Sequence, residues 1–311
     1  MYSIWMYISY YIRPLIKWFL RKTTGLCELQ RICYGEKHGS VRIKGVENSL
    51  NLSRCPQIKL LVNHLNDVCD NQRFTASNER EILECATRTV LWVKQINPQV
   101  HLQFVKSFSR CVEQIWGYRQ LMTEVETLRT TSYDADNLDH ERKLYELWNN
   151  LKPDEVLTSR VSKQWQDIGF QGDDPKTDFR GMGLLGLENL LFFAEEFKGP
   201  ASHVLSHSLH PHYGYAFAIV GINITSMAWC LLRDGNAKTY FYNTCKSLPN
   251  IHHFHQFYCY LFYEFDRFWI ECKPKNIMEF SDIRTKFEEN IRASLLDPHG
   301  VFRINVSVDT V

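Results

Sequence analysis

The sequence predicts an all-α protein: a single multi-helix domain preceded by an apolar, amphipathic helical extension at the N-terminus. Over most of the chain, apolar residues recur at every third or fourth position, which is the period of an amphipathic helix. No run alternates apolar and polar residues for long enough to predict a sheet. With 15 glycines and 10 prolines in 311 residues, the chain also lacks the turn content that is typical of a β-sandwich or barrel.

The helical pattern divides the chain into three parts. Residues 1–55 are an apolar and basic helix followed by an irregular or short extended connection over 35–55, where Gly35, Gly39 and Gly45 lie. Residues 56–297 form the helical domain, and residues 298–311 form a tail. Within the domain we expect helices over 58–69, 79–96, 100–128, 138–151, 215–232, 251–269 and 277–296. Ser77 is placed to cap the second of these helices.

The first 20 residues are apolar and aromatic but predict neither a spanning helix nor a cleavable signal. Arg13 and Lys17 interrupt the run, and inserting each near a bilayer centre would cost about 2.5–3.5 kcal/mol, which argues against a spanning helix. The basic residues follow the apolar stretch, whereas in a cleavable signal they precede it. Arg13, Lys17 and Arg21 share one helical face. A basic stripe beside an apolar face favours a helix that lies on an endomembrane surface through residues 1–22. The alternative is a terminal helix docked on the protein's own core, with its cations solvated.

Charge and cysteine usage limit the classes of partner and the compartment. The 36 basic residues almost balance the 35 acidic ones, so the formal net charge of +1 gives no general electrostatic case for binding nucleic acid. The ten cysteines are scattered and include no C-x-x-C pair, and a chain of this length needs no disulfide framework. We therefore expect a cytoplasmic protein. If residues 1–22 lie on a membrane surface, the protein is also peripheral on endomembranes.

The composition changes between Trp165 and Phe193. Four glycines and Pro175 cluster between two helical runs, and glycine permits left-handed backbone and close approach whereas proline fixes its own φ. The loop is therefore expected to have a specified conformation. Charged side chains crowd it: Asp173, Asp174, Asp178 and Arg180. A polar loop that opens an apolar helix is a common location for function.

The stretch from Trp165 to Gly183 reads W-x-x-x-G-F-Q-G-x-D-P-x-T-D-F-R-G-x-G and resembles the signature of the ELMO (engulfment and cell motility) domain. Later blocks resemble the same family: His210-Pro211, residues 215–225 and residues 254–258. The N-terminal helix and residues 27–31 are similar to the small stand-alone proteins that contain this domain. The resemblance covers nearly the whole chain, with its core signature at residues 165–193.

The resemblance implies an all-helical activator of GTP hydrolysis by Arf and Arf-like GTPases, which is an enzyme activator and not itself an enzyme. It implies no cofactor of its own, because GTP and Mg²⁺ belong to the partner, and it gives Arg180 the role of a catalytic arginine supplied in trans. A guanidinium offers fixed donors to the oxygens on which charge builds during phosphoryl transfer. The alternative is a non-catalytic adaptor that binds regulators of small GTPases, because a fold does not fix its function.

Each residue of the signature also has a structural alternative. Arg180 is either the catalytic arginine or an ion-pair partner of Asp174 or Asp178. The two aspartates are expected to organise the loop, by capping the following helix or by orienting Arg180. Gln171 is either a second group that aligns water or a loop hydrogen-bonding residue. Trp165, Phe170 and Phe179 are expected to be anchors packed beneath the loop. Gly172, Thr177 and Gly181 are expected to organise the loop or to contact the partner.

Histidines raise a metal hypothesis. His203 and His207 are four residues apart, and further histidines stand at 210, 212, 252, 253 and 255. Three such histidines and an aspartate could hold zinc in a metallohydrolase. No H-E-x-x-H motif is present, however, and helix packing explains the same spacings. We therefore assign no metal ligands from the sequence.

Overall fold

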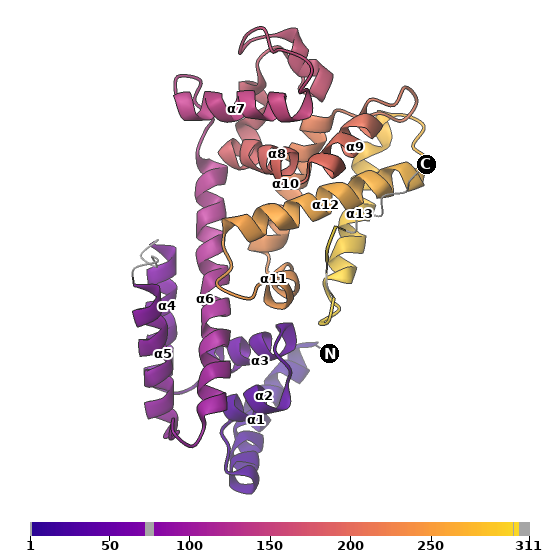
Figure 1. Ribbon diagram of the computed structural model, residues 1–311. Helices are drawn as coiled ribbons and strands as arrows, with labels where there is room; N and C mark the ends of the chain where they lie inside the picture. The colour runs from indigo at the N-terminus through magenta and orange to yellow at the C-terminus, as the bar shows by residue number, and fades with distance from the viewer. Residues whose placement is uncertain (1, 72–77, 301, 305–311) are drawn as a thin grey trace. The chain divides into compact units, whose positions relative to one another are not determined.

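The computed structural model describes residues 2–71, 78–300 and 302–304, with side chains from residue 11 onward. Every regular element in these residues is a helix, which confirms the all-α fold class (Figure 1). The chain divides into two compact units, residues 1–120 with 245–248 and residues 121–244 with 249–311. The boundary between the units falls inside helix α6, and not at residue 56, where the helical domain was expected to begin. The limits 56–297 of that domain stay a prediction.

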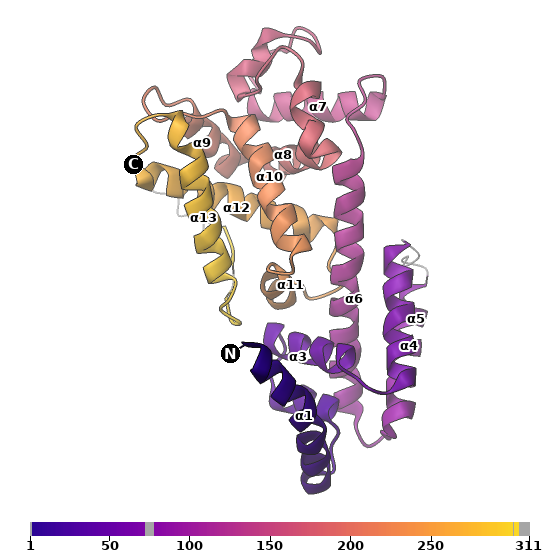
Figure 2. The ribbon, with the colours of Figure 1, turned by 180° about the vertical axis from the view of Figure 1, so that it is seen from behind.

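The first unit consists of helices from the N-terminal part of the chain. They are α1 (Tyr2–Thr24), α2 (Glu28–Gly35), α3 (Ser40–Asn51), α4 (Pro56–Asp70), α5 (Glu79–Lys94) and the beginning of α6 (Leu102–Thr130). Helices α4 and α5 lie side by side in both views (Figures 1 and 2). Both agree with the expected ranges to within two residues. The proposed cap Ser77 lies outside the described residues, and Asn78 precedes α5 without a side-chain capping bond.

The prediction of an irregular connection over residues 35–55 is wrong, because α3 occupies most of it. Ile43, Val46 and Leu50 are buried at helical spacing, a pattern that the nearby glycines obscured. Gly45 lies inside the helix, where a Cβ would stand 3.2 Å from a methyl carbon of Ile32. The glycine therefore serves close packing of α3 against α2 and does not end the helix.

The second unit contains the rest of α6 and all later elements. They are α7 (Leu138–Leu151), the 3₁₀ helices η1 (Lys163–Ile168) and η2 (Pro175–Gly181), α8 (Gly183–Glu196), α9 (Lys198–Ser208), α10 (Phe217–Arg233), α11 (Lys238–Thr244), α12 (Ile251–Cys272), η3 (Ile277–Glu279) and α13 (Phe280–Ser294). Helix α8 packs on α7, α10 and α12, and α12 also contacts α9 and α13. The helices α8, α10 and α12 form the core: α8 and α10 are apolar over most of their length, and α12 buries a broad apolar stripe.

The described residues contain no single helix with the length and apolar character needed to span a bilayer. Helices α10 and α11 together meet that test by length and composition, although they are bent by 85° relative to each other. Most of α10 is buried within the second unit, including Phe217, Ile224 and Leu231.

A chain of buried polar side chains links the three core helices. The Nδ1 of His255 on α12 lies 2.7 Å from Oδ1 of Asn189 on α8, and the Asn189 amide donates to Oγ1 of Thr225 on α10 at 3.1 Å. The Thr225 hydroxyl donates in turn to the carbonyl of Gly221. All three side chains are buried. Because the amide nitrogen of Asn189 is used as a donor, its oxygen accepts from His255, which fixes the neutral imidazole with its proton on Nδ1.

This buried imidazole predicts a pH dependence of stability. Burial lowers the pKa of His255 from about 6.5 to about 3, so the folded protein leaves it neutral while the unfolded chain protonates it below about 6.5. The free energy of unfolding should therefore fall as the pH decreases from about 6.5 towards about 3, by up to about 1.4 kcal/mol per pH unit from this residue. Urea unfolding of wild type and His255→Gln at several pH values measures the difference in slope. Parallel slopes would contradict the assignment.

Candidate functional site

The signature loop is held from beneath by buried aromatic rings. Trp165 is 0% exposed, and its indole Nε1 donates to the carbonyl of Arg160 at 2.8 Å. Its ring meets Phe170 edge-to-face at 5.6 Å between centroids, and Phe170 meets Phe179 in the same way at 5.6 Å. Trp148 of α7 contacts the other side of Trp165 at 5.6 Å. These edge-to-face contacts connect the loop to α7, and they anchor both 3₁₀ helices through buried aromatic side chains.

Gly169 is the position at which the loop meets α10. Its φ is +83°, and an added Cβ would lie 2.2 Å from the backbone nitrogen of Phe217 and 2.6 Å from the carbonyl carbon of Ala216. Its carbonyl accepts from the amide of Ile219 at 3.3 Å. Only glycine combines the left-handed backbone with this close approach, so the sequence expectation for glycine in this loop is confirmed at residue 169.

Asp174 and Asp178 of the loop both accept hydrogen bonds that fix the backbone. Asp174 caps η2, because its Oδ1 accepts from the amide of Lys176 at 3.1 Å, and it pairs with Nη1 of Arg160 at 2.8 Å. Asp178 Oδ2 accepts from the amide of Gln171 at 2.9 Å. Each carboxylate thus joins two turns of the loop and is already engaged by a donor other than Arg180.

Arg180 lies near the end of η2 with its side chain exposed. It follows the buried Phe179, which is 1% exposed, and it stands two residues before buried Met182. Among the residues that the structure describes, none forms a hydrogen bond or ion pair with its guanidinium. The ion-pair alternative with Asp174 or Asp178 is therefore not what the structure contains. The result is a cation on an anchored backbone, directed to solvent.

The other signature residues fall into two groups. Gln171, Thr177 and Gly181 are exposed, and Gly172 is half-buried. A Cβ at Gly172 or Gly181 would meet nothing within 4 Å, so the fold itself does not require glycine there. Thr177 donates its hydroxyl to the carbonyl of Asp174 at 3.3 Å, whereas Gln171 is bonded through its backbone amide. Close packing therefore does not explain glycine at residues 172 and 181, and their role in loop organisation or partner contact stays a prediction.

Nothing in the sequence indicated two residues that support the loop, or the contact that requires glycine at a third, Gly183, which ends the signature. Arg160, five residues before the signature, holds Asp174, and no local pattern distinguishes it from a solvated arginine. Tyr133 lies in what reads as a polar turn, yet it is buried, with its ring 5.8 Å from that of Phe179. Gly183, with φ +53°, packs against the carbonyls of Arg129 and Thr131, where a Cβ would lie at 2.4 Å from each oxygen. The end of α6 therefore supports the beginning of α8.

The loop geometry predicts unequal effects of two glycine substitutions. Gly169→Ala should lower the free energy of unfolding by about 3 kcal/mol or more, because strain from positive φ adds to a backbone clash. Gly172→Ala, three residues away in open space, is the matched control and should change it by less than about 0.5 kcal/mol. Urea denaturation followed by circular dichroism measures both. Similar losses in the two variants would show that the contact with Phe217 is not the constraint described.

The basic stripe of α1 turns towards its own unit. Arg13 and Lys17 pair with Glu28 of α2 at 3.1 and 2.5 Å, and Ser49 also donates to this carboxylate. Burial raises the pKa of Glu28, but these hydrogen bonds and the two positive charges outweigh burial and hold the pKa below its usual 4.5. Two of the three stripe cations therefore neutralise a partly buried carboxylate, in contrast to the expectation that the stripe faces lipid or solvent.

The opposite face of α1 is apolar and open. Leu15, Trp18 and Phe19 are 68%, 62% and 59% exposed, and Tyr11, Ile12 and Ile16 are exposed beside them. Beneath the helix lies a cavity of about 890 Å³. The cavity is lined by the stripe cations and by apolar residues of the first unit, which include Pro14, Leu29, Leu50 and Ile58. Helix α1 is thus attached through its charges and presents its large apolar side chains outward.

The histidines of the second unit are dispersed except at one place. His255 is buried against Asn189, His253 bonds Asn250, and the ring of His210 stacks on Tyr213. By contrast, His203 and His207 of α9 meet Asp266 of α12. The sequence could not single out Asp266, because it lies 59 residues beyond His207 and within an apolar helix.

Comparison with known proteins places the chain beside one family and several relatives of similar length. The ELMO/CED-12 family profile matches residues 123–284. ELMO domain-containing protein 2 of Bos taurus is 46% identical over 296 residues, covering 95% of this chain and 96% of the relative. ELMO domain-containing protein 1 of Bos taurus is 46% identical over 300 residues, covering 91% and 88%. ELMO domain-containing protein B of Dictyostelium discoideum is 34% identical over 282 residues, covering 89% and 93%.

These similarities define the class of protein. The chain belongs to the ELMO/CED-12 family, and the family match contains the whole signature loop with Arg180. Proteins with this domain act in the regulation of small GTPases. No solved structure gives a significant match to the chain.

Proposed function

We propose that this protein activates GTP hydrolysis by Arf-family or Arf-like GTPases and that Arg180 is the group it supplies in trans. The observation that carries the proposal is the placement of Arg180: an exposed guanidinium on an anchored backbone, with both nearby carboxylates engaged elsewhere. A structural arginine would be expected to pair with one of those carboxylates. The resemblance of the signature and membership of the ELMO/CED-12 family support the same role.

The chemistry explains why an arginine suits this position. When water attacks the γ-phosphate, negative charge develops on the γ-phosphoryl oxygens and on the bridging oxygen. A guanidinium offers several donors in a fixed plane and stays protonated, so that it stabilises these oxygens without reorganisation. In this proposal the GTPase supplies GTP, Mg²⁺ and the water-positioning residue. This protein supplies the guanidinium of Arg180 and the surface around it that contacts the GTPase.

The surface beside Arg180 is suited to close approach by a partner. Gly181 is exposed next to it, and a side chain at this position would project into open space. Gln171, Lys176 and Thr177 are also exposed on the same loop. We assign Gln171, Thr177, Gly172 and Gly181 to partner contact, whereas Asp174, Asp178, Trp165 and Phe170 hold the loop.

Substitution of Arg180 tests the catalytic role. Arg180→Ala should lower the stimulated single-turnover rate of GTP hydrolysis by about 10³-fold or more, with little change in folding stability because the side chain is exposed. Arg180→Lys should also lose most of the stimulation, since an ammonium lacks the planar arrangement of donors. The measurement is made across a panel of GTP-loaded Arf and Arf-like proteins.

The control is Arg267→Ala, which removes an exposed arginine of α12 and should leave the rate unchanged. Binding of the GTP-loaded partner, measured in parallel, separates catalysis from recruitment. If the wild-type protein binds these GTPases but does not accelerate hydrolysis, the adaptor alternative replaces the proposal. If the wild-type protein accelerates hydrolysis and Arg180→Lys retains full stimulation, Arg180 is not the group supplied in trans.

We also propose that residues 1–22 bring the protein to endomembranes as a peripheral, cytoplasmic protein. Helix α1 presents a set of large apolar side chains on one face, and aromatic residues such as Trp18 and Phe19 are favoured at the lipid headgroup boundary. Because Glu28 engages Arg13 and Lys17, burial of the apolar face supplies the attraction, and Arg21 and Lys22 contribute charge.

Vesicle flotation tests this contact. Replacing Leu15, Trp18 and Phe19 together with serine should weaken binding to phosphatidylcholine vesicles by at least about tenfold, because the burial of three large apolar side chains is lost. The control replaces Leu138, Val156 and Met278 with serine; these apolar residues of the second unit are at least as exposed as the three of α1. Equal flotation of the two triple variants would remove α1 as the membrane contact.

A further inference from the structure

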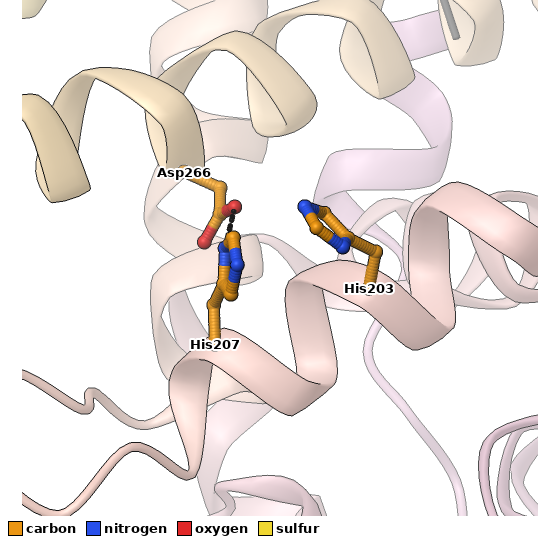
Figure 3. Close-up of side chains that lie close together, drawn as sticks. All are labelled: His203, His207 and Asp266. Atoms are coloured by element: carbon orange, nitrogen blue, oxygen red, sulfur yellow. Dashed lines mark hydrogen bonds and ion pairs between the residues drawn. The ribbon is translucent and has the colours of Figure 1, made fainter. Parts of the chain in front are cut away.

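A second cluster of reactive side chains lies outside the signature loop. His203 and His207 stand one turn apart on α9, and both rings point towards Asp266 on α12 (Figure 3). The His207 Nδ1 is 2.7 Å from Asp266 Oδ2, and the two imidazole centroids are 4.1 Å apart. One donor atom from each of the three residues lies within 4.8 Å of those from the other two.

The cluster has one buried side and one open side. Asp266 is 0% exposed, the side chain of His207 is 32% exposed, and His203 is exposed. Burial raises the pKa of Asp266 above its usual 3.8, although the hydrogen bonds from Tyr215 and His207 act in the opposite direction. A carboxylate in this position is destabilised unless a cation or strong donors neutralise it. His203 adds a second imidazole, which forms no hydrogen bond to any described residue.

We propose that His203, His207 and Asp266 bind a divalent transition-metal ion of the zinc class, with one coordination position open to solvent. Two imidazole nitrogens and one carboxylate oxygen are a donor set that zinc accepts, at about 2.0–2.2 Å from each donor. Tetrahedral geometry at these lengths separates neighbouring donors by about 3.3 Å. In the proposed site the three donors move to that separation. The proton between His207 Nδ1 and Asp266 Oδ2 moves to His207 Nε2, which leaves the Nδ1 lone pair for the ion and keeps the imidazole neutral.

A further residue fixes the orientation of the carboxylate. The Tyr215 hydroxyl donates to Asp266 Oδ1 at 2.6 Å, whereas Oδ2 lies 2.7 Å from Nδ1 of His207. Hydrogen bonds of this kind orient metal ligands and strengthen binding. Tyr215 is 7% exposed and immediately precedes Ala216, whose backbone contacts Gly169. A bound ion would therefore stabilise the packing of α9 on α12 and the connection that supports the signature loop.

The proposal is tested by metal binding to the full-length protein after treatment with a chelator and dialysis. Zn²⁺ is titrated into wild type and into His203→Ala, and binding is measured by isothermal calorimetry. Wild type should bind one equivalent of Zn²⁺ more than His203→Ala, or should bind that equivalent at least about tenfold more tightly. The expected size follows because loss of a residue that merely orients a ligand already lowers metal affinity by about 10–100-fold. His203 is exposed and makes no hydrogen bond to the described residues, so this variant keeps the folded structure. Both proteins contain the same ten cysteines, of which Cys85 and Cys272 are exposed, so the difference reports the imidazole.

The matched control is His212→Ala, an exposed histidine near the cluster but outside it, which should bind Zn²⁺ as wild type does. Thermal unfolding gives a second readout: Zn²⁺ should raise the midpoint of wild type and of His212→Ala but not that of His203→Ala. If wild type and His203→Ala show the same stoichiometry, affinity and midpoint shift, the three residues form a hydrogen-bonded cluster only and the proposal is overturned.

Discussion

The contact between Gly169 and the backbone of Ala216 and Phe217 is the constraint on which the functional loop depends. A left-handed backbone at residue 169 allows the chain to leave η1 directly against the start of α10. Phe170 is thereby placed between Trp165 and Phe179, and the second 3₁₀ helix follows on this aromatic support. Without this approach the rings would lack a fixed surface, and the position of residue 180 would not be defined.

The distribution of charge within the loop follows from the same anchoring. Asp174 is engaged by Arg160 and by the η2 amide, and Asp178 by the amide of Gln171, so the acidic side chains act on the backbone. Arg180 is left with its charge towards solvent. In the proposed function the loop uses its carboxylates for shape and its arginine for an external partner, an arrangement that fits regulation of another protein better than chemistry on a small substrate held within this chain.

Most of the fold could be predicted because its signals are local. The spacing of apolar residues over 138–151 and 251–269 predicted α7 and most of α12, because helical periodicity can be recognised without information from distant residues. The helix over Ser40–Asn51 was missed because its glycines resemble turn residues, and only the neighbouring Ile32 explains Gly45. The signature residues could be identified as a group, and Trp165, Phe170 and Phe179 were expected beneath the loop, where they lie buried. The choice between a paired and an exposed Arg180 stayed open in the sequence.

What the sequence could not supply were the contacts between distant segments. Arg160 with Asp174, Tyr133 with Phe179, and Asp266 with the histidines of α9 all depend on how helices pack. The same limitation applies to α1, where spacing correctly placed Arg13 and Lys17 on one face but gave no indication that Glu28 would engage them. Electrostatic pattern identifies a stripe, whereas the orientation of that stripe is a tertiary property.

The anchored backbone of η2 also bears on the entropy of complex formation. A loop that must order on contact loses about 1–2 kcal/mol per residue in backbone freedom, whereas one long side chain loses about 2 kcal/mol or less. Because Asp174, Pro175 and Phe179 already fix the chain on the N-terminal side of residue 180, this penalty falls on a single guanidinium-bearing side chain. A short-lived encounter can then be productive, since little of the free energy of association is consumed in shaping the loop.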